Sequence, residues 1–288
     1  MGVEQFDGAD RRLSVDRRSA LAALAALVGE GHAFFADDID ERYRTDLHRK
    51  SRSEPAIVVR PADTAQVAEA LRLASAAGLK VTALGGATGL VGGGVSENGG
   101  VLLSLERLTA ITELDPESMT MTVQAGVTVE AAQAAAEEQG LLFPLDLGSR
   151  GSATIGGAVA TNAGGTRVLR WGMMRDMVLG LEAVLADGTV VSSMVKSLKD
   201  NAGYDWKQLM IGSEGTLGVV TTVMVRLRAA PRTSQTALIA VDSVADVAKI
   251  LRRLDARLGG SLSSFELMWN DFYGFVTTAQ RRDPPLPP

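Results

Sequence analysis

The apolar positions in the first third of the chain predict a strand, then a helix, then a second strand. An apolar run over 56–59 predicts a buried strand. Apolar residues then recur at helical spacing over 67–74, after a candidate N-cap at Asp63 or Thr64. A second strand is predicted over 80–84. This order of strand, helix and strand ends in a glycine-rich loop.

The middle of the chain continues the mixture of strands and helices. Apolar clustering predicts strands over 101–105 and 119–124, followed by a helix over 129–139 that begins at a capping threonine. Residues 176–192 hold two apolar strands around an Asp-Gly turn, which indicates a hairpin. A further strand is predicted over 218–228. These elements indicate a mixed α+β fold.

Both ends of the chain predict additional structure. Residues 1–50 read as an N-terminal helical extension, in which Leu21, Leu24 and Val28 share one helix face. After Pro231 the pattern predicts a strand over 236–241, a helix over 243–258 and a third, strand-containing piece over 261–275. A second α+β domain is therefore expected to begin there, and its proline-rich end indicates an extended linker.

Composition narrows the function classes. The 288 residues are 46% hydrophobic, so a large core is expected. A net charge of −5 without a basic stripe argues against a nucleic-acid partner. The chain has no cysteine, which excludes disulfides and Fe–S clusters and is compatible with a cytoplasmic location, and its two histidines are too few for a multi-histidine metal site. No apolar run is long enough for a transmembrane helix.

The segment LGGATGLVGGG, residues 84–94, follows the predicted strand over 80–84. Consecutive glycines let several backbone N–H groups turn toward one anion, and a diphosphate suits such a site. Neither the G-x-G-x-x-G nor the G-x-x-x-x-G-K-[ST] pattern occurs in the chain. The segment thus predicts a nucleotide cofactor site of another class, with a merely flexible loop as the alternative.

Two more glycine clusters follow in order. One runs through FPLDLGSRGSATIGGAVATNAGG, residues 143–165, and the other through LKDNAGYDWKQLMIGSEGTLGVVT, residues 198–221. With GGATGLVGG and RWGMMRDMVLGLEAVLADGTVV, these stretches resemble the FAD-binding domain of the vanillyl-alcohol oxidase / p-cresol methylhydroxylase (PCMH) superfamily. Within it, the likeness is to the FAD-linked D-2-hydroxyacid dehydrogenases, and it runs from about Tyr43 to about Pro231.

The resemblance implies a fold and a division into domains. The expected fold class is α+β, a two-lobed PCMH-type FAD-binding domain followed by the beginning of an α+β substrate cap domain. The FAD-binding domain would span 51–231, with a small lobe over about 51–107 and a large lobe over about 108–231. Residues 232–288 would begin the cap, which in this family continues further, so the chain reads as C-terminally truncated.

The resemblance also implies FAD as the cofactor and a set of residues that bind it. Relatives that tether the flavin at the loop do so through a histidine, and Ala87 and Thr88 stand in that place, so noncovalent FAD is expected. Glu214 has two readings, a carboxylate near the cofactor or one that satisfies N–H groups in its own turn. The expected cofactor-binding residues are Leu84, Gly85, Gly86, Ala87, Thr88, Gly89, Leu90, Asp146, Leu147, Gly148, Ser149, Ile155, Gly156, Gly157, Thr161, Asn162, Ala163, Glu214, Gly218 and Val219.

The function implied by the resemblance is FAD-dependent oxidation of a D-2-hydroxy acid, such as D-lactate, D-2-hydroxyglutarate or glycolate, to the 2-oxo acid. The electron acceptor would be a quinone, an electron-transfer flavoprotein or a cytochrome, and a homo-oligomer is left open. Catalytic residues are unknown, and no metal ligand is assigned. Two alternatives remain: a flavin-binding module whose substrate site lies on another chain, and a reductase of the cell-wall precursor type from the same superfamily.

Overall fold

The structure is a computed structural model that describes residues 7–279, 283 and 285–286. Its first sheet has the order β1-β2-β4-β3. The strands β2 (Ile57–Val59), β4 (Val101–Ser104) and β3 (Val81–Leu84) are parallel, and β1 (Ala33–Phe34) pairs antiparallel with β2. Every residue of β2 and β4 is buried, as expected for parallel strands covered on both faces. The three strands predicted in this region are confirmed.

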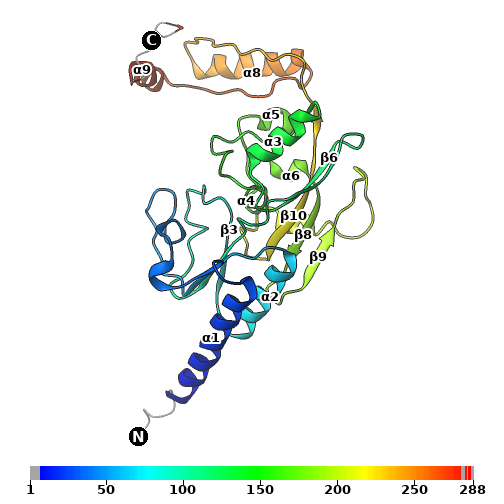
Figure 1. The fold of residues 1–288 in the computed structure, drawn as a ribbon. Coiled ribbons are helices and arrows are strands. Elements are labelled where there is room, and N and C mark those ends of the chain that lie inside the picture. The colour runs from blue at the N-terminus through cyan, green and yellow to red at the C-terminus, as the bar shows by residue number, and fades with distance from the viewer. Residues whose placement is uncertain (1–6, 280–282, 284, 287–288) are drawn as a thin grey trace.

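Two helices cover one face of this sheet (Figure 1). They are α1 (Asp7–Val28) and α2 (Thr64–Ala76), and they pack on each other. Asp63 caps α2 as predicted, because its side chain accepts a hydrogen bond of 2.8 Å from the Gln66 N–H. Two 3-10 turns, η1 (Ala36–Asp38) and η2 (Glu41–Tyr43), lead to the other face, where Tyr43 packs with Val58 and Leu102.

The second sheet is antiparallel and has the order β5-β6-β10-β8-β9. Its strands are β5 (Ile111–Asp115), β6 (Thr120–Gln124), β8 (Val178–Val184), β9 (Val190–Ser193) and β10 (Val219–Arg226). The predicted hairpin is confirmed as β8 and β9. The sequence missed β5, an edge strand whose first three residues are exposed, because such a strand carries no apolar alternation.

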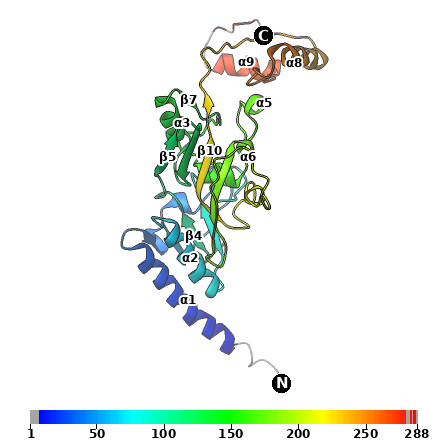
Figure 2. The ribbon, with the colours of Figure 1, turned by 90° about the vertical axis from the view of Figure 1, so that its right-hand side faces the viewer.

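Short helices pack with the second sheet around the main hydrophobic core (Figure 2). These are α3 (Val129–Glu138), α4 (Ile155–Ala160), α5 (Val168–Trp171), α6 (Met174–Met177) and α7 (Lys207–Met210). Thr128 and Thr154 cap α3 and α4 with their hydroxyl oxygens. A two-stranded sheet of β7 (Leu141–Leu142) and β11 (Arg228–Ala229) lies at the end of β10.

A carboxylate on β8 makes hydrogen bonds with residues of both lobes, which are the parts of the chain built on the first sheet (small lobe) and on the second sheet (large lobe). Glu182 lies on β8, and its Oε1 accepts hydrogen bonds from the hydroxyls of Thr64 at 2.8 Å, Thr221 at 2.8 Å and Thr222 at 3.0 Å. Thr64 begins α2 of the small lobe, and the other two threonines lie at a bulge in β10 of the large lobe. The carboxylate therefore ties the second sheet to the helix that covers the first.

The last part of the chain lies apart from both sheets, at the opposite end from α1 (Figures 1 and 2). It holds α8 (Val244–Leu258), which confirms the predicted helix, and α9 (Asn270–Ala279). The strands predicted over 236–241 and within 261–275 are wrong. Residues 236–241 and 261–269 are coil, since no strand of the described residues lies beside them to satisfy their backbone N–H and C=O groups.

Candidate cofactor site

The glycine loop begins where β3 ends, at the carboxyl edge of the parallel strands. Ligands of open parallel sheets bind at this edge. The loop lies against the turn that precedes α4. A Cβ at Gly85 would stand 2.6 Å from the Thr154 hydroxyl, and a Cβ at Gly86 only 1.8 Å from the Ser152 carbonyl oxygen. Close packing therefore favours glycine at both positions, against a side-chain hydroxyl at Gly85 and against backbone at Gly86.

The other loop positions differ in what they require. Gly89 has no positive φ, and a Cβ there would meet no atom within 4 Å. The left-handed residues of the loop are Ala87, with φ of 53°, and Gly92, with φ of 77°. A positive φ thus explains the glycine at position 92. The close approach of the segment 152–154 explains the glycines at positions 85 and 86.

The loop offers its backbone donors to a ligand. The N–H groups of residues 86–91 donate to no acceptor among the described residues. Exposed, unpaired N–H groups at the end of a strand suit an anion such as a diphosphate. This is the fit expected of the loop in a nucleotide site.

Strained backbone gathers at the predicted site. Six described residues other than glycine have positive φ, and three of them are predicted cofactor-binding residues: Ala87, Asn162 at 47° and Glu214 at 51°. Such conformations cost about 1–3 kcal/mol each and persist where the surroundings enforce them, often at ligand sites. Each of the three glycine clusters contributes one.

Arg175 holds two of these strained turns together. Its backbone N–H donates to Asn162 Oδ1 at 2.9 Å, and its guanidinium donates to the Gln208 side chain at 2.7 Å and to the Ile211 carbonyl at 2.8 Å. The Glu214 N–H completes the link by donating to the Ala160 carbonyl at 2.9 Å. Sequence reasoning missed Arg175, since its partners lie 13 to 36 residues away.

The segment 146–149 is fixed to the turn after α4. A Cβ at Gly165 would lie 1.9 Å from the Asp146 carbonyl oxygen, so the two backbones touch. The Asp146 carboxylate accepts a hydrogen bond of 3.1 Å from the Thr166 hydroxyl and pairs with Arg167 at 3.2 Å. Asp146 therefore positions this segment through its side chain.

The predicted residues divide by exposure. Leu84, Ile155 and Val219 are buried in the packing of the two lobes, so their side chains are part of the core, and the Gly156 backbone is buried with them. The remainder are half-buried or exposed. The exposed ones, which lie open to a ligand, are Ala87, Gly89, Leu90, Gly148, Ser149, Thr161 and Glu214.

Glu214 faces the glycine loop. Its Oε2 would lie 3.3 Å from a Cβ at Gly93, and its carboxylate accepts no hydrogen bond from a described residue. The reading in which it satisfies N–H groups of its own turn is therefore not observed. Its turn is fixed instead by the bond to the Ala160 carbonyl.

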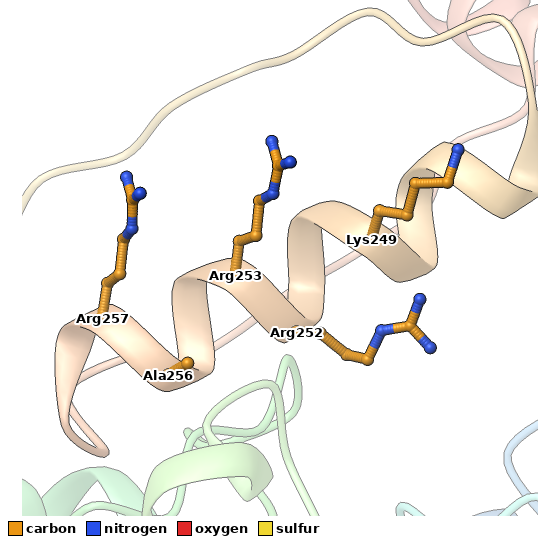
Figure 3. A pocket seen from close by; sticks show the side chains of 5 residues that line it. All are labelled: Lys249, Arg252, Arg253, Ala256 and Arg257. Carbon is orange, nitrogen blue, oxygen red and sulfur yellow. The ribbon is translucent and has the colours of Figure 1, made fainter.

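The two helices at the far end contribute no predicted site residue. A shallow depression on α8 is lined by the basic side chains of Lys249, Arg252, Arg253 and Arg257 (Figure 3). Most of these side chains extend into solvent along an exposed helix, which is typical of a solvated surface. Among the described residues, no helix is long and apolar enough to span a bilayer, and no group of three or more acidic or histidine side chains lies together as metal ligands would.

Comparison with known proteins places the FAD-binding part of the chain. Residues 55–193 match the family model described as FAD binding domain. The chain is 42% identical to D-2-hydroxyglutarate dehydrogenase, mitochondrial, of Bos taurus over 255 residues, which cover 88% of this chain and 47% of that protein. It is 41% identical to D-2-hydroxyglutarate dehydrogenase of Xanthomonas citri pv. viticola, over 78% of this chain and 48% of that protein.

A solved structure of alkyldihydroxyacetonephosphate synthase has the same fold, with a TM-score of 0.65 and 22% identity over 75% of this chain and 41% of that one. The chain spans about half the length of the curated relatives that it matches. The resemblance, the fold class and FAD as cofactor are thus confirmed. Residues 55–193 match the FAD binding domain family, and the chain is similar in sequence to D-2-hydroxyglutarate dehydrogenases.

Proposed function

We propose that the chain is the FAD-binding part of a flavoprotein dehydrogenase that oxidises a D-2-hydroxy acid to the 2-oxo acid. The names of its relatives support the substrate class. The observation that carries the proposal is the assembly of the unpaired N–H groups of 86–91 with the strained turns at Asn162 and Glu214. The loop and Asn162 lie within the matched FAD binding domain, and Glu214 follows it in the chain.

Different segments of the site would bind different parts of the cofactor. The N–H groups of 86–91 would hold the diphosphate, and the segments 146–149 and 161–163 would hold the rest of FAD. The bound flavin supplies a hydride acceptor for the carbon that carries the hydroxyl. The chain's part is to hold it rigidly, which the Arg175 hydrogen bonds do for two of the turns. No catalytic base is assigned among the described residues.

FAD is held noncovalently in this proposal, since neither Ala87 nor Thr88 forms a bond to a flavin. The location in this proposal is cytoplasmic, although the bovine relative carries the word mitochondrial in its name. Fractionation of the source cells tests the location.

The electron acceptor in this proposal is a quinone, an electron-transfer flavoprotein or a cytochrome. Assays that follow the reduction of each class of acceptor distinguish the three.

The experiment begins with purified chain reconstituted with FAD. Binding is followed by the quenching of flavin fluorescence, and the D and L forms of 2-hydroxyglutarate and lactate are then added without oxygen. We expect the chain to bind FAD. With this chain alone, the bound flavin should stay oxidised after either enantiomer is added. A longer chain that includes the region matching the rest of the relatives should bleach the flavin with the D form only.

Each outcome separates the candidates. Absence of FAD binding would refute the proposal at its base. Equal bleaching by both enantiomers would refute the D-hydroxy acid assignment. Activity that requires a second, separate polypeptide would favour the alternative of a flavin-binding module, whereas bleaching by a nicotinamide cofactor would favour the reductase.

A further inference from the structure

Arginines surround one tryptophan ring at the end of the large lobe. The Arg170 guanidinium carbon lies 4.4 Å from the centre of the Trp171 ring, and that of Arg228 lies 5.4 Å from the same centre. Arg226, two residues before Arg228, lies near enough to repel it. These four residues form the arginine–tryptophan cluster.

Within the part of the chain that the structure describes, the positive charges of this cluster have no counter-ion. The guanidinium groups of Arg170, Arg226 and Arg228 make no hydrogen bond or ion pair with any residue that the structure describes. By contrast, the neighbouring Arg167 is paired with Asp146 at 3.2 Å. Burial lowers the pKa of Arg228, and the nearby Arg226 lowers it further. A partly buried guanidinium that also faces a like charge favours the approach of an anion.

The cluster is fixed in place by the fold. Trp171 ends α5 and packs against the main hydrophobic core. Arg228 lies on β11, which pairs through Leu142 with β7. The ring and the two guanidiniums stacked on it therefore come from two separate elements that the core and a small sheet hold together. Such a site is set before any ligand arrives.

The cluster also adjoins the candidate flavin segments along the chain. Leu142 precedes the segment 146–149 by a few residues, and α5 follows the turn at 161–165. Beyond β11 the chain leaves the large lobe toward α8 (Figure 1). Trp171 and the strand paired with β11 are thus close along the chain to two flavin segments, and Arg228 lies near the point from which the chain continues toward α8.

We propose that the arginine–tryptophan cluster is a carboxylate-binding site for a small organic acid. The inference rests on the proposed function, because a 2-hydroxy acid always carries a carboxylate and a dicarboxylic one carries two. Planar guanidiniums bind carboxylates in a bidentate manner, and a stacked aromatic ring fixes the plane of each guanidinium. A dicarboxylate can reach more than one of the three arginines and is the favoured ligand.

Glutarate is the probe, since it is a dicarboxylate without a hydroxyl to oxidise and its binding needs no flavin chemistry. Calorimetric titration of the purified chain without FAD should give saturable binding with glutarate. The Trp171 ring should report it as a change in tryptophan fluorescence that Trp171→Phe removes without abolishing the calorimetric signal. Sodium chloride at matched ionic strength should give neither signal.

Variants then locate the site. Arg228→Gln should weaken glutarate binding about 10-fold to 100-fold, the effect of losing a charged hydrogen bond. Arg228→Lys keeps the charge and should weaken it less. Arg252→Gln, which removes an exposed arginine of α8, should leave the affinity unchanged. Circular dichroism confirms that each variant is folded.

The results bear separately on the two proposals. Glutarate binding that Arg228→Gln leaves unchanged, or that sodium chloride reproduces, would overturn the carboxylate site. Absence of any glutarate binding by the folded chain would overturn it as well. A chain that binds glutarate but does not bind FAD would instead refute the proposed function and still support the carboxylate site.

Discussion

Gly86→Val is the substitution that most directly tests how the glycine loop is built. A Cβ on Gly86 would lie 1.8 Å from the Ser152 carbonyl oxygen and 2.7 Å from its carbonyl carbon, where ordinary contact requires 3.4–4 Å. The opposing atoms are backbone. They cannot rotate away, because the N–H groups of Ser152 and Ala153 are both bonded to the Ser149 carbonyl, at 2.9 and 2.8 Å.

The loop must therefore move, and the movement has a cost. Overpacking in a close-packed region costs about 1–3 kcal/mol, and contact with backbone places this case near the upper end. At about 2–4 °C per kcal/mol for a domain of this size, the melting temperature should fall by about 5–10 °C. FAD affinity should fall by at least about tenfold, because the donors at 86–91 move with the loop.

Gly89→Ala is the matched control. It adds a Cβ on the same loop where no atom lies within 4 Å and φ is not positive, so the stability change should stay within about 0.5 kcal/mol. Its FAD affinity should still fall if the diphosphate approaches this backbone. Thermal unfolding and FAD titration of both variants give the comparison. A Gly86→Val protein with wild-type melting temperature and affinity would refute the close approach.

Three further results are expected. Acid precipitation of the flavin-loaded chain should release all FAD into the supernatant, because Ala87 offers no atom for a covalent bond, and flavin on the pellet would contradict this. Glu182→Ala should lower the unfolding free energy by about 2 kcal/mol, since three hydroxyls lose one acceptor, with Glu182→Gln retaining part of it. Burial raises the pKa of Glu106, but hydrogen bonds from Arg60 and Tyr43 outweigh it and hold the pKa below 4.5. The ionised Glu106 therefore stabilises the fold at a pH above 4.5, the ordinary pKa of a glutamate, and this stabilisation is lost as the pH falls through the lower pKa of the folded state. The unfolding free energy of Glu106→Gln should consequently depend less on pH in the acid range than that of the wild type.

Local signals in the sequence were sufficient for most of the fold. The caps at Asp63 and Thr128 and the Asp-Gly turn of the β8–β9 hairpin act through neighbours only a few residues away, so a sequence window contains both partners. The coil at 236–241 shows the limit of that reasoning. Its apolar pattern suits a strand, but a strand exists only where another strand satisfies its backbone, and that information lies elsewhere in the chain.

In the candidate site, too, some features follow from neighbouring residues and others depend on residues far away in the chain. Glycine content showed that the loop at 84–94 is special, but the reason at Gly86 is a carbonyl of Ser152, 66 positions further along the chain. Charge composition likewise gave a net value of −5 and no expectation of a basic site. Arg170 and Arg228 come together around Trp171 only when α5 and β11 meet, and no described residue supplies a counter-ion to either guanidinium. The effect of a charge depends on which partner the fold places beside it. For that reason, FAD could be inferred from the family resemblance of the glycine clusters, whereas the proposed carboxylate site required the packed structure.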